Sequence, residues 1–484
     1  MEAKTLRELE AIFHPRSVAV IGAREVDGFA ASLAGTKMKE NLFLVNPRHQ
    51  ELLGRKCYPG ILDIKEDIDY VIIEVPAVVV PGVLEDCIKK KVKAAHIFSS
   101  GFSETGLEER VKLEDEVKKI AKGKIRLIGP NCMGIHYARS GLAFSPGAPA
   151  EEGNVGVISQ SGTFADAFLD LSKIRNIHFS KVVSYGNGID LDCPDFLEYL
   201  SQDEETTAIA LYIEGTRDGM RLKSALRKAA KRKPIIALKG GITEHGSRAA
   251  ASHTGSLAGS PEVWRAFFRQ AGVVQVETFD ELANTILALS RSPLPSGKGV
   301  SLITNSGGFS VMETDMCVKV GLEVPQFTEK TLRELRKIVP LAGTGISNPL
   351  DAWPLYYNPP VLRDTIKAIA GDRNIHSLVL HIDEMKYWLQ VWGEALDAAL
   401  KEILPLMVEG CVYTRDEINK PVMVCVALEA YSQDEKDRKY HLMVKREFEN
   451  RGFPVYPTLE GTTKALFNLY RYRRRFSPGR SSVT

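Results

Sequence analysis

Two stretches of this sequence are nearly alike, and their repetition constrains the fold more than any other feature. Gly156–Phe164 reads GVISQSGTF, and Ser301–Phe309 reads SLITNSGGF. Each combines an apolar run, a Ser-Gly pair and the start of a helical pattern, which predicts a buried strand, a sharp turn and a first helical turn. A similar loop follows each copy, Asn187–Asp190 after the first and Asn348–Asp351 after the second. The repetition predicts two domains of the same α/β topology.

The bulk properties exclude several classes of protein. A chain of 484 residues is too long for one core and suggests about three domains. The net charge of +2 gives no support for nucleic-acid binding. Seven scattered cysteines without a Cys-x-x-Cys pair argue against a zinc site or a disulfide framework. Charges are spread through the first ten residues, which lack the apolar core of a signal peptide, and no apolar run is long enough to cross a bilayer. We therefore expect a cytoplasmic protein without nucleic-acid or membrane partners.

The N-terminal part alternates short apolar runs with helical patterns. Strands are predicted at residues 17–21, 42–45, 70–75, 95–98 and 126–128, and the clearest helices at 79–91 and 107–122. This rhythm predicts βαβ units with a mostly parallel sheet, whose ligands bind at the carboxyl ends of the strands. Two segments rich in proline and glycine, 145–153 and 292–299, separate further α/β patterns. The predicted domains are 1–145, 146–292 and 293–484.

The residues that follow the first two predicted strands indicate which nucleotide the N-terminal domain could bind. Gly22 and Gly28 make only a poor fragment of the Gly-x-Gly-x-x-Gly fingerprint. An NAD site also calls for an acidic residue after the second strand, where this chain has Arg48. A cation there favours a phosphorylated ribose, as in coenzyme A or NADP. The alternative is a βαβ domain in which these turns are only structural.

The two Ser-Gly turns are candidate phosphate sites. A helix N-terminus leaves backbone N–H groups unpaired and carries a partial positive charge, so it attracts anions. Glycine lets the anion approach the backbone closely, and hydroxyl side chains add donors. The candidate residues are Ser161, Gly162, Thr163, Ser306, Gly307 and Gly308. Alternatively, the serines only cap their helices. Two near-copies on either side of a Ser-His-Thr-Gly sequence favour the phosphate interpretation.

His253 is the candidate nucleophile. It lies in Ser252–Gly255, and its neighbours from Ala249 to Gly259 are small apart from Leu257, which suits a loop that moves and accommodates a phosphoryl group. A nucleophilic imidazole must be neutral and held in one tautomer, normally by a carboxylate or carbonyl on its other nitrogen. Glu214, at the end of a predicted strand, is the best-placed carboxylate, although it also fits a surface turn.

Several motifs occur in one order along the chain. They are Ile128–Cys132 (IGPNC), Ser159–Thr163 (SQSGT), Ser252–Gly255 (SHTG), Ser306–Gly308 and Asn348–Asp351. From about Phe13 to about residue 460, the chain resembles the α subunit of ADP-forming acetyl-CoA synthetases. These belong to the NDP-forming acyl-CoA synthetase superfamily, which includes succinyl-CoA synthetase. The resemblance implies an α/β protein with a Rossmann-like CoA-binding domain, followed by two flavodoxin-like domains of the succinyl-CoA ligase type.

The resemblance also implies roles for individual residues. His253 would be phosphorylated and Glu214 would hold its imidazole, while the two Ser-Gly helices would face the phosphate. Coenzyme A would contact Gly22, Ala23, Arg24, Pro47, Arg48, Val75, Pro76, Ser99 and Asn131. Two segments, 22–28 and 185–194, depart from the family's usual spelling, the second of them near the acyl pocket.

The implied function is an acid–thiol ligase reaction. Acyl-CoA, phosphate and ADP would be converted reversibly to carboxylic acid, coenzyme A and ATP, through an acyl phosphate and a phosphohistidine. The sequence has neither a P-loop nor a segment for an ATP-grasp fold. A separate ATP-grasp β subunit would then bind Mg-ADP or Mg-ATP in an α₂β₂ assembly. The alternatives are a non-catalytic, CoA-binding regulatory module and an NAD(P)-dependent oxidoreductase.

Overall fold

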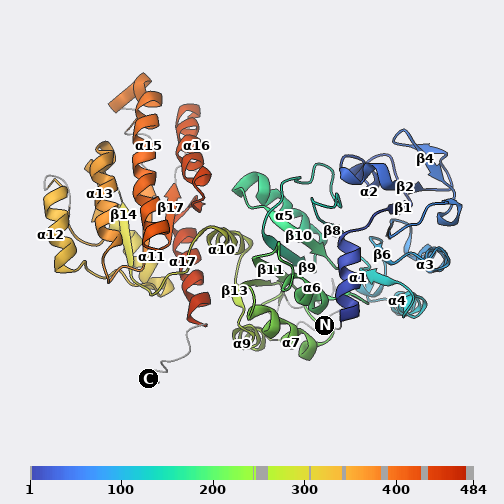
Figure 1. The fold of residues 1–484 in the computed structure, drawn as a ribbon. Coiled ribbons are helices and arrows are strands. Elements are labelled where there is room, and N and C mark those ends of the chain that lie inside the picture. Colours follow the sequence, from blue (N-terminus) through green and yellow to red (C-terminus); the bar gives the residue numbers. More distant parts are fainter. Residues whose placement is uncertain are drawn as a thin grey trace. The chain divides into compact units, whose positions relative to one another are not determined.

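The computed structural model describes residues 3–243, 245–246, 260–304, 307–340, 345–382, 388, 391–426 and 434–475. The chain divides into two compact units, Met1–Glu277 and Thr278–Thr484 (Figure 1). The first unit contains two sheets and the second contains one. The predicted domain boundaries at 145 and 292 stay predictions. Within the described ranges, no helix combines the length and apolar character needed to span a bilayer.

The first sheet has the strand order expected of a dinucleotide-type fold. Its strands are β1 (Val18–Ile21), β2 (Leu42–Val45), β3 (Glu51–Leu52), β4 (Arg55–Tyr58), β5 (Tyr70–Ile73), β6 (Ala94–Ile97) and β7 (Arg126–Ile128). The order is β3-β4-β2-β1-β5-β6-β7, with only β3 antiparallel to its neighbour. When β3 is left out and the other six strands are numbered in chain order, this is the order 3-2-1-4-5-6 of the Rossmann fold. The helices are α1 (Ala3–Phe13), α2 (Phe29–Ala34), α3 (Val80–Lys89) and α4 (Glu108–Ala121).

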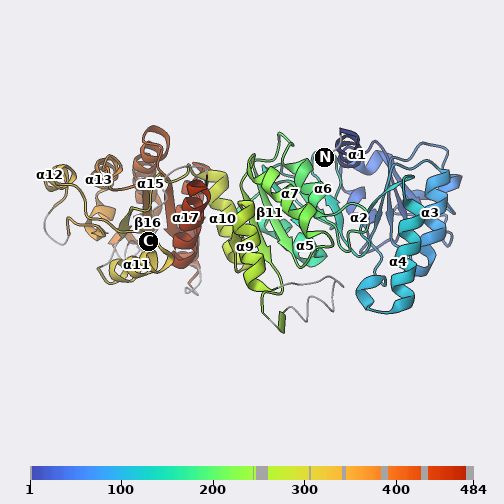
Figure 2. The ribbon, with the colours of Figure 1, turned by 90° about the horizontal axis from the view of Figure 1, so that it is seen from below.

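The second sheet belongs to the same unit and has a flavodoxin-like order. Its strands are β8 (Gly134–His136), β9 (Val155–Ser159), β10 (Phe179–Ser184), β11 (Ala208–Ile213), β12 (Ile235–Lys239) and β13 (Val274–Val276). The parallel strands lie in the order β10-β9-β11-β12-β13, which is 2-1-3-4-5 when β9 is counted as the first strand. Strand β8 pairs antiparallel with β10 at the edge of the sheet. The helices are α5 (Gly162–Arg175), α6 (Cys193–Leu200), α7 (Gly219–Ala230) and α9 (Pro261–Ala271). Helices α6 and α7 pack side by side against this sheet (Figure 2).

The second unit repeats this strand order. Its strands are β14 (Val300–Thr304), β15 (Leu350–Asp351), β16 (Ser377–Ile382), β17 (Val422–Val426) and β18 (Val455–Tyr456), in the order β15-β14-β16-β17-β18. The helices are α10 (Phe279–Arg291), α11 (Gly307–Val320), α12 (Glu329–Ile338), α13 (Pro359–Ala370), α15 (Leu396–Val412), α16 (Glu435–Asn450) and α17 (Leu459–Arg474). This is again 2-1-3-4-5. The predicted α/β fold class is confirmed.

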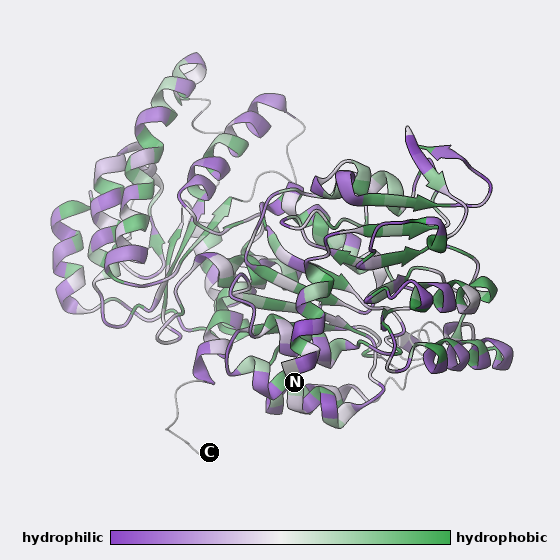
Figure 3. Cartoon of the chain, turned by 45° about the vertical axis from the view of Figure 1, so that its right-hand side comes forward, coloured by the Kyte–Doolittle hydropathy of each residue, from purple (hydrophilic) through white to green (hydrophobic). Residues whose placement is uncertain are grey.

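The sheets form because their strands are apolar runs buried on both faces. All residues of β11 and β16 are buried, and Figure 3 shows the central strands of the sheets mainly in the green of hydrophobic residues. Such continuous apolar runs are typical of parallel sheets covered on both sides. Short 3-10 helices lie at Lys37–Asn41, Ile61–Asp63, Ala77–Val79, Ser103–Thr105, Trp353–Tyr357 and Gly393–Ala395, and a π-helical turn at Tyr413–Glu417.

The loop Asn187–Asp190 links the two sheets of the first unit. The Arg126 guanidinium, on β7, donates to both carboxylate oxygens of Asp190 at 2.8 and 3.1 Å. The Asn187 side-chain amide donates to Glu104 at 2.7 Å and to the buried Glu114 at 2.8 Å. The predicted loop therefore bonds to strand β7 and to helix α4, both of which belong to the first sheet and its helices.

The buried imidazole of His96 predicts an acid sensitivity of the fold. His96, on β6, approaches the Cys132 carbonyl through Nε2 at 2.9 Å, and burial lowers its pKa to about 4. Below pH 6.5 the imidazole of His96 is protonated in the unfolded chain but stays neutral in the folded chain. The free energy of unfolding therefore falls as the pH drops from 6.5 towards 4. Between pH 7 and 4.5 we expect His96 to cost about 2 kcal/mol of unfolding free energy.

Denaturant titrations of the wild type and His96→Gln at both pH values test this prediction. Glutamine keeps a neutral donor that can reach the Cys132 carbonyl, so its pH dependence should be smaller by that amount. His136, whose pKa burial also lowers to about 4, provides a residual acid sensitivity in both proteins. An equal pH dependence in the wild type and the variant would contradict the assignment to His96.

Candidate functional site

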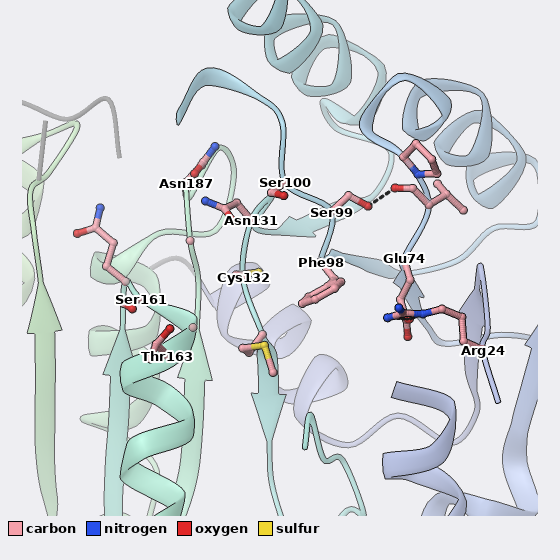
Figure 4. Close-up of a pocket in the computed structure, with 16 residues that line it drawn as sticks. Arg24, Glu74, Phe98, Ser99, Ser100, Asn131, Cys132, Ser161, Thr163 and Asn187 are labelled. Carbon is pink, nitrogen blue, oxygen red and sulfur yellow. Dashed lines mark hydrogen bonds and ion pairs between the residues drawn. The ribbon is translucent and has the colours of Figure 1, made fainter. Parts of the chain in front are cut away.

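A cavity of about 540 Å³ lies at the carboxyl ends of strands from both sheets of the first unit. Figure 4 shows Arg24 and Glu74 on one side of it and Ser161 and Thr163 on the other. The lining residues are Arg24, Glu74, Val75, Pro76, Phe98, Ser99, Ser100, Asn131, Cys132, Met133, Gln160, Ser161, Gly162, Thr163, Gly186 and Asn187. This edge is where ligands of parallel α/β sheets bind.

The start of helix α5 forms one wall of the cavity. Ser161 is the N-cap, and its hydroxyl accepts the N–H of Phe164 at 3.4 Å. The backbone N–H groups of Gly162 and Thr163 make no hydrogen bond to any residue that the structure describes. Free amides at the positive end of a 14-residue helix suit an anion. A Cβ at Gly162 would lie 2.9 Å from Met133 Cγ, so glycine allows the start of α5 to pack closely against Met133.

Two backbone turns meet at the junction of the sheets. Asn131 has a left-handed backbone (φ 59°), and its N–H donates to the Ser99 carbonyl at 3.0 Å. Gly186, after β10, also has positive φ (56°), and a Cβ there would lie 2.3 Å from the carbonyl oxygens of Pro130 and Asn131. The N–H of Asn187 donates to the Pro130 carbonyl at 3.0 Å. Only glycine permits this close contact, which joins the two domains beside the cavity.

Glu74 occupies the far wall and was not a predicted site residue. Its Oε1 accepts the N–H of Phe29, the first residue of α2, at 2.9 Å. Its Oε2 accepts from Arg24 at 3.2 Å, and the Glu74 side chain is only 1% exposed. Burial raises the pKa of Glu74, although Phe29 and Arg24 oppose that rise. The start of α2, where the Rossmann fold holds a pyrophosphate, is thus already occupied by a carboxylate.

Glu214 lies at the same sheet edge, directly after β11. Its Oε1 accepts the hydroxyl of Tyr212 at 3.0 Å, and its backbone N–H donates to Gln160 Oε1 at 2.7 Å. The Lys239 ammonium donates to the Glu214 carbonyl at 2.7 Å, and burial lowers the pKa of Lys239 to about 8. Glu214 is buried, so it is not the surface carboxylate of the alternative interpretation.

The structure brings together part of the predicted set. Of the predicted CoA contacts, Arg24, Val75, Pro76, Ser99 and Asn131 line the cavity, as do the three residues of the first Ser-Gly turn. The remaining contacts, Gly22, Ala23, Pro47 and Arg48, follow β1 and β2 at the same edge without lining it. Gly307 and Gly308 begin α11 in the second unit and are exposed. His253 and Ser306 lie outside the described residues.

The sequence contained signals for two lining residues that were not predicted. Glu74 stands directly after a buried strand, and Gln160 stands between a strand and the Ser-Gly turn. A polar residue at the carboxyl end of a parallel strand is a candidate ligand contact by position alone.

Comparisons with known proteins agree with this architecture. Residues 16–138 match the family described as CoA binding domain, and residues 152–289 match the succinyl-CoA ligase like flavodoxin domain. The first of these spans contains the first sheet, and the second contains β9 to β13 with helix α5.

Curated relatives share most of the chain. The chain is 34% identical to acetate–CoA ligase [ADP-forming] I subunit alpha of Pyrococcus furiosus, over 96% of this chain and 98% of the relative. It is 40% identical to acetate–CoA ligase [ADP-forming] II subunit alpha of the same organism, over 77% of this chain and 81% of the relative. It is 45% identical to acetate–CoA ligase [ADP-forming] of Methanocaldococcus jannaschii, over 71% of this chain. The chain spans about half the length of this relative and of a similar one from Archaeoglobus fulgidus.

Solved structures are similar over nearly the whole chain. The dinucleotide-forming acetyl-coenzyme A synthetase 1 of Candidatus Korarchaeum cryptofilum, in complex with phosphate and ADP, has a TM-score of 0.79 and 30% identity, covering 96% of this chain and 97% of that one. A protein from Pyrococcus horikoshii OT3 has a TM-score of 0.77 and 31% identity, with coverages of 96% and 99%. Together with the two matching domain families and the alpha-subunit relatives, these likenesses show that the chain belongs to the family of ADP-forming acetate–CoA ligases.

Proposed function

We propose that this chain is the α subunit of an ADP-forming acyl-CoA synthetase that works through an acyl phosphate and a phosphohistidine. The observation that carries the proposal is one cavity that combines both requirements of the first step. Its first-sheet side includes five residues predicted to contact CoA, and its second-sheet side includes the start of α5, where two backbone amides have no partner among the described residues. A thioester and a phosphate can therefore meet in this cavity.

The proposed reaction has three steps. Phosphate attacks the acyl-CoA thioester, releasing coenzyme A and leaving an acyl phosphate. His253 takes the phosphoryl group from this mixed anhydride and frees the carboxylic acid. The phosphohistidine then passes the phosphoryl group to ADP, and every step is reversible. The helix start at Gly162 stabilises the phosphoryl charge, and Glu214 orients the imidazole.

The position of Glu214 supports the second step. Strands β11 and β12 pair in register, with Ile213 beside Lys239, so the chain leaves β12 at the edge where Glu214 lies. In the sequence, His253 lies between Gly246 and Ser260, the described residues on either side of it. In the second unit α11 begins at Gly307, and we propose that Gly307, Gly308 and the preceding Ser306 bind phosphate by the same helix-end chemistry.

We further propose a separate ATP-grasp β subunit that binds the magnesium nucleotide in an α₂β₂ assembly. Relatives named as alpha subunits support a separate partner subunit for this chain. In the relative that is about twice as long, the additional length would correspond to such a partner joined to the same chain. The structural relative in complex with phosphate and ADP supports the nucleotide class. For this chain, coenzyme A fits better than NAD, because Glu74 occupies the amide at the start of α2 and Arg48 follows β2.

A labelling experiment tests the proposal. The purified chain, alone and with its partner, is incubated with acetyl [³²P]phosphate, and CoA release from acetyl-CoA plus phosphate is followed with a thiol reagent. We expect a base-stable, acid-labile label on the wild type and none on His253→Ala. CoA binding without label, with the partner present, would instead indicate a regulatory module. NAD binding without CoA binding would indicate an oxidoreductase.

A further inference from the structure

The side-chain amide of Gln160 is fixed in one orientation at the cavity wall. Gln160 stands between β9 and α5 and is only 8% exposed. Its Oε1 accepts two backbone N–H groups, those of Glu214 at 2.7 Å and Gly215 at 3.1 Å. Because a backbone N–H can only donate, the accepting atom must be the amide oxygen. The polar atom that Gln160 can offer to the cavity is therefore Nε2.

This donor has no partner among the residues that the structure describes. Gln160 lines the cavity, and across the described ranges of the chain no group accepts a hydrogen bond from its Nε2. Nε2 is not among the buried unpartnered atoms, so water in the cavity reaches it, and a ligand oxygen that replaces this water would accept its hydrogen bond. The free amides of Gly162 and Thr163 lie on the same wall. The wall thus offers a helix end for an anion and, beside it, a neutral donor.

We propose that Gln160 Nε2 donates to the acyl oxygen of the substrate while phosphate attacks the thioester. This inference rests on the proposed function and adds a catalytic residue to it. A phosphate oxygen forms the new bond to the carbonyl carbon, and the π electrons of the carbonyl move onto its oxygen. Those electrons then return, the C–S bond breaks, and coenzyme A leaves as a thiolate that takes a proton from water.

The two donors on the wall suit the two oxygens of this step. Phosphate is an anion from the start, so the permanent partial charge of the α5 end holds it before reaction. The acyl oxygen becomes charged only in the tetrahedral intermediate, and a preorganised neutral donor stabilises it there without binding the ground state tightly. The hydrogen bonds from Glu214 and Gly215 hold that donor in place.

Gln160→Glu separates this role from a structural one. The glutamate keeps an oxygen for the two backbone N–H groups but has no donor, so we expect an unchanged melting temperature. The kcat of phosphate-dependent CoA release from acetyl-CoA, at saturating phosphate, should fall about 10²–10³-fold. The neutral Gln160→Met should show the same fall in kcat. Gln202→Glu, at an exposed glutamine outside the cavity, is the matched control and should keep the wild-type kcat.

The outcomes distinguish the two proposals. A Gln160→Glu enzyme with wild-type kcat would overturn the role of Gln160 while leaving the proposed function intact. A defect confined to the KM for phosphate in Gln160→Glu and absent in Gln160→Met would indicate charge repulsion alone and would also overturn it. A wild-type protein without CoA release or histidine label, with its partner present, would overturn the proposed function and this inference together.

Discussion

Replacing Glu214 by glutamine is expected to slow the labelling of His253 by acetyl phosphate by about three to four orders of magnitude. The carboxylate is proposed to hold the imidazole in the tautomer that leaves one nitrogen free for attack. A neutral amide in that place can stabilise the wrong tautomer and cannot stabilise the developing positive charge. The corresponding substitution in serine-protease triads has an effect of about 10⁴. Rapid-quench measurement of ³²P incorporation gives the rate directly.

The fold should survive this substitution. The glutamine oxygen can still accept the Tyr212 hydroxyl, and the backbone hydrogen bond to Gln160 is unaffected. The melting temperature should therefore stay close to that of the wild type. Glu204→Gln, on an exposed loop before β11, removes the same charge away from the cavity and should be labelled normally. Equal labelling rates in Glu214→Gln and the wild type would show that another group orients the histidine.

The parts of this fold that follow local patterns were predictable from the sequence. Apolar runs predicted β2 and β7 with the bounds that the structure has. The three-residue strand β8 was missed because it exists only through antiparallel pairing with β10. Strands β3 and β15 were also missed, because they have two residues each and therefore show no apolar periodicity.

The site divides in the same way. The Ser-Gly turn before α5 and the Asn131 turn were visible as motifs, because glycine, serine and asparagine have strong local preferences. The role of Glu74 was not visible, because it depends on the start of a helix 45 positions earlier in the chain. The fixed orientation of Gln160 likewise depends on amides more than 50 positions away. Hydrogen bonds between distant segments leave no periodic trace in a sequence.

Gly186→Ala is expected to destabilise the first unit by about 3 kcal/mol and to abolish CoA binding. The added methyl group would lie 2.3 Å from two backbone carbonyl oxygens, which no rotamer change can relieve. The turn at Pro130 and Asn131 must then move away from β10, and Asn131 and Gly186 both line the cavity. Urea denaturation measures the stability, and calorimetric titration with coenzyme A measures the binding.

Gly147→Ala is the control that distinguishes the steric clash at position 186 from the cost of placing alanine in a left-handed backbone conformation. Gly147 also has positive φ (70°), but a Cβ there would meet nothing within 4 Å. Its substitution should cost only the left-handed penalty of about 1 kcal/mol and leave CoA binding unchanged. The difference between the two variants then measures the contact that joins the two sheets at the cavity. If both alanines cost the same and both bind CoA, the close contact at Gly186 does not shape the site.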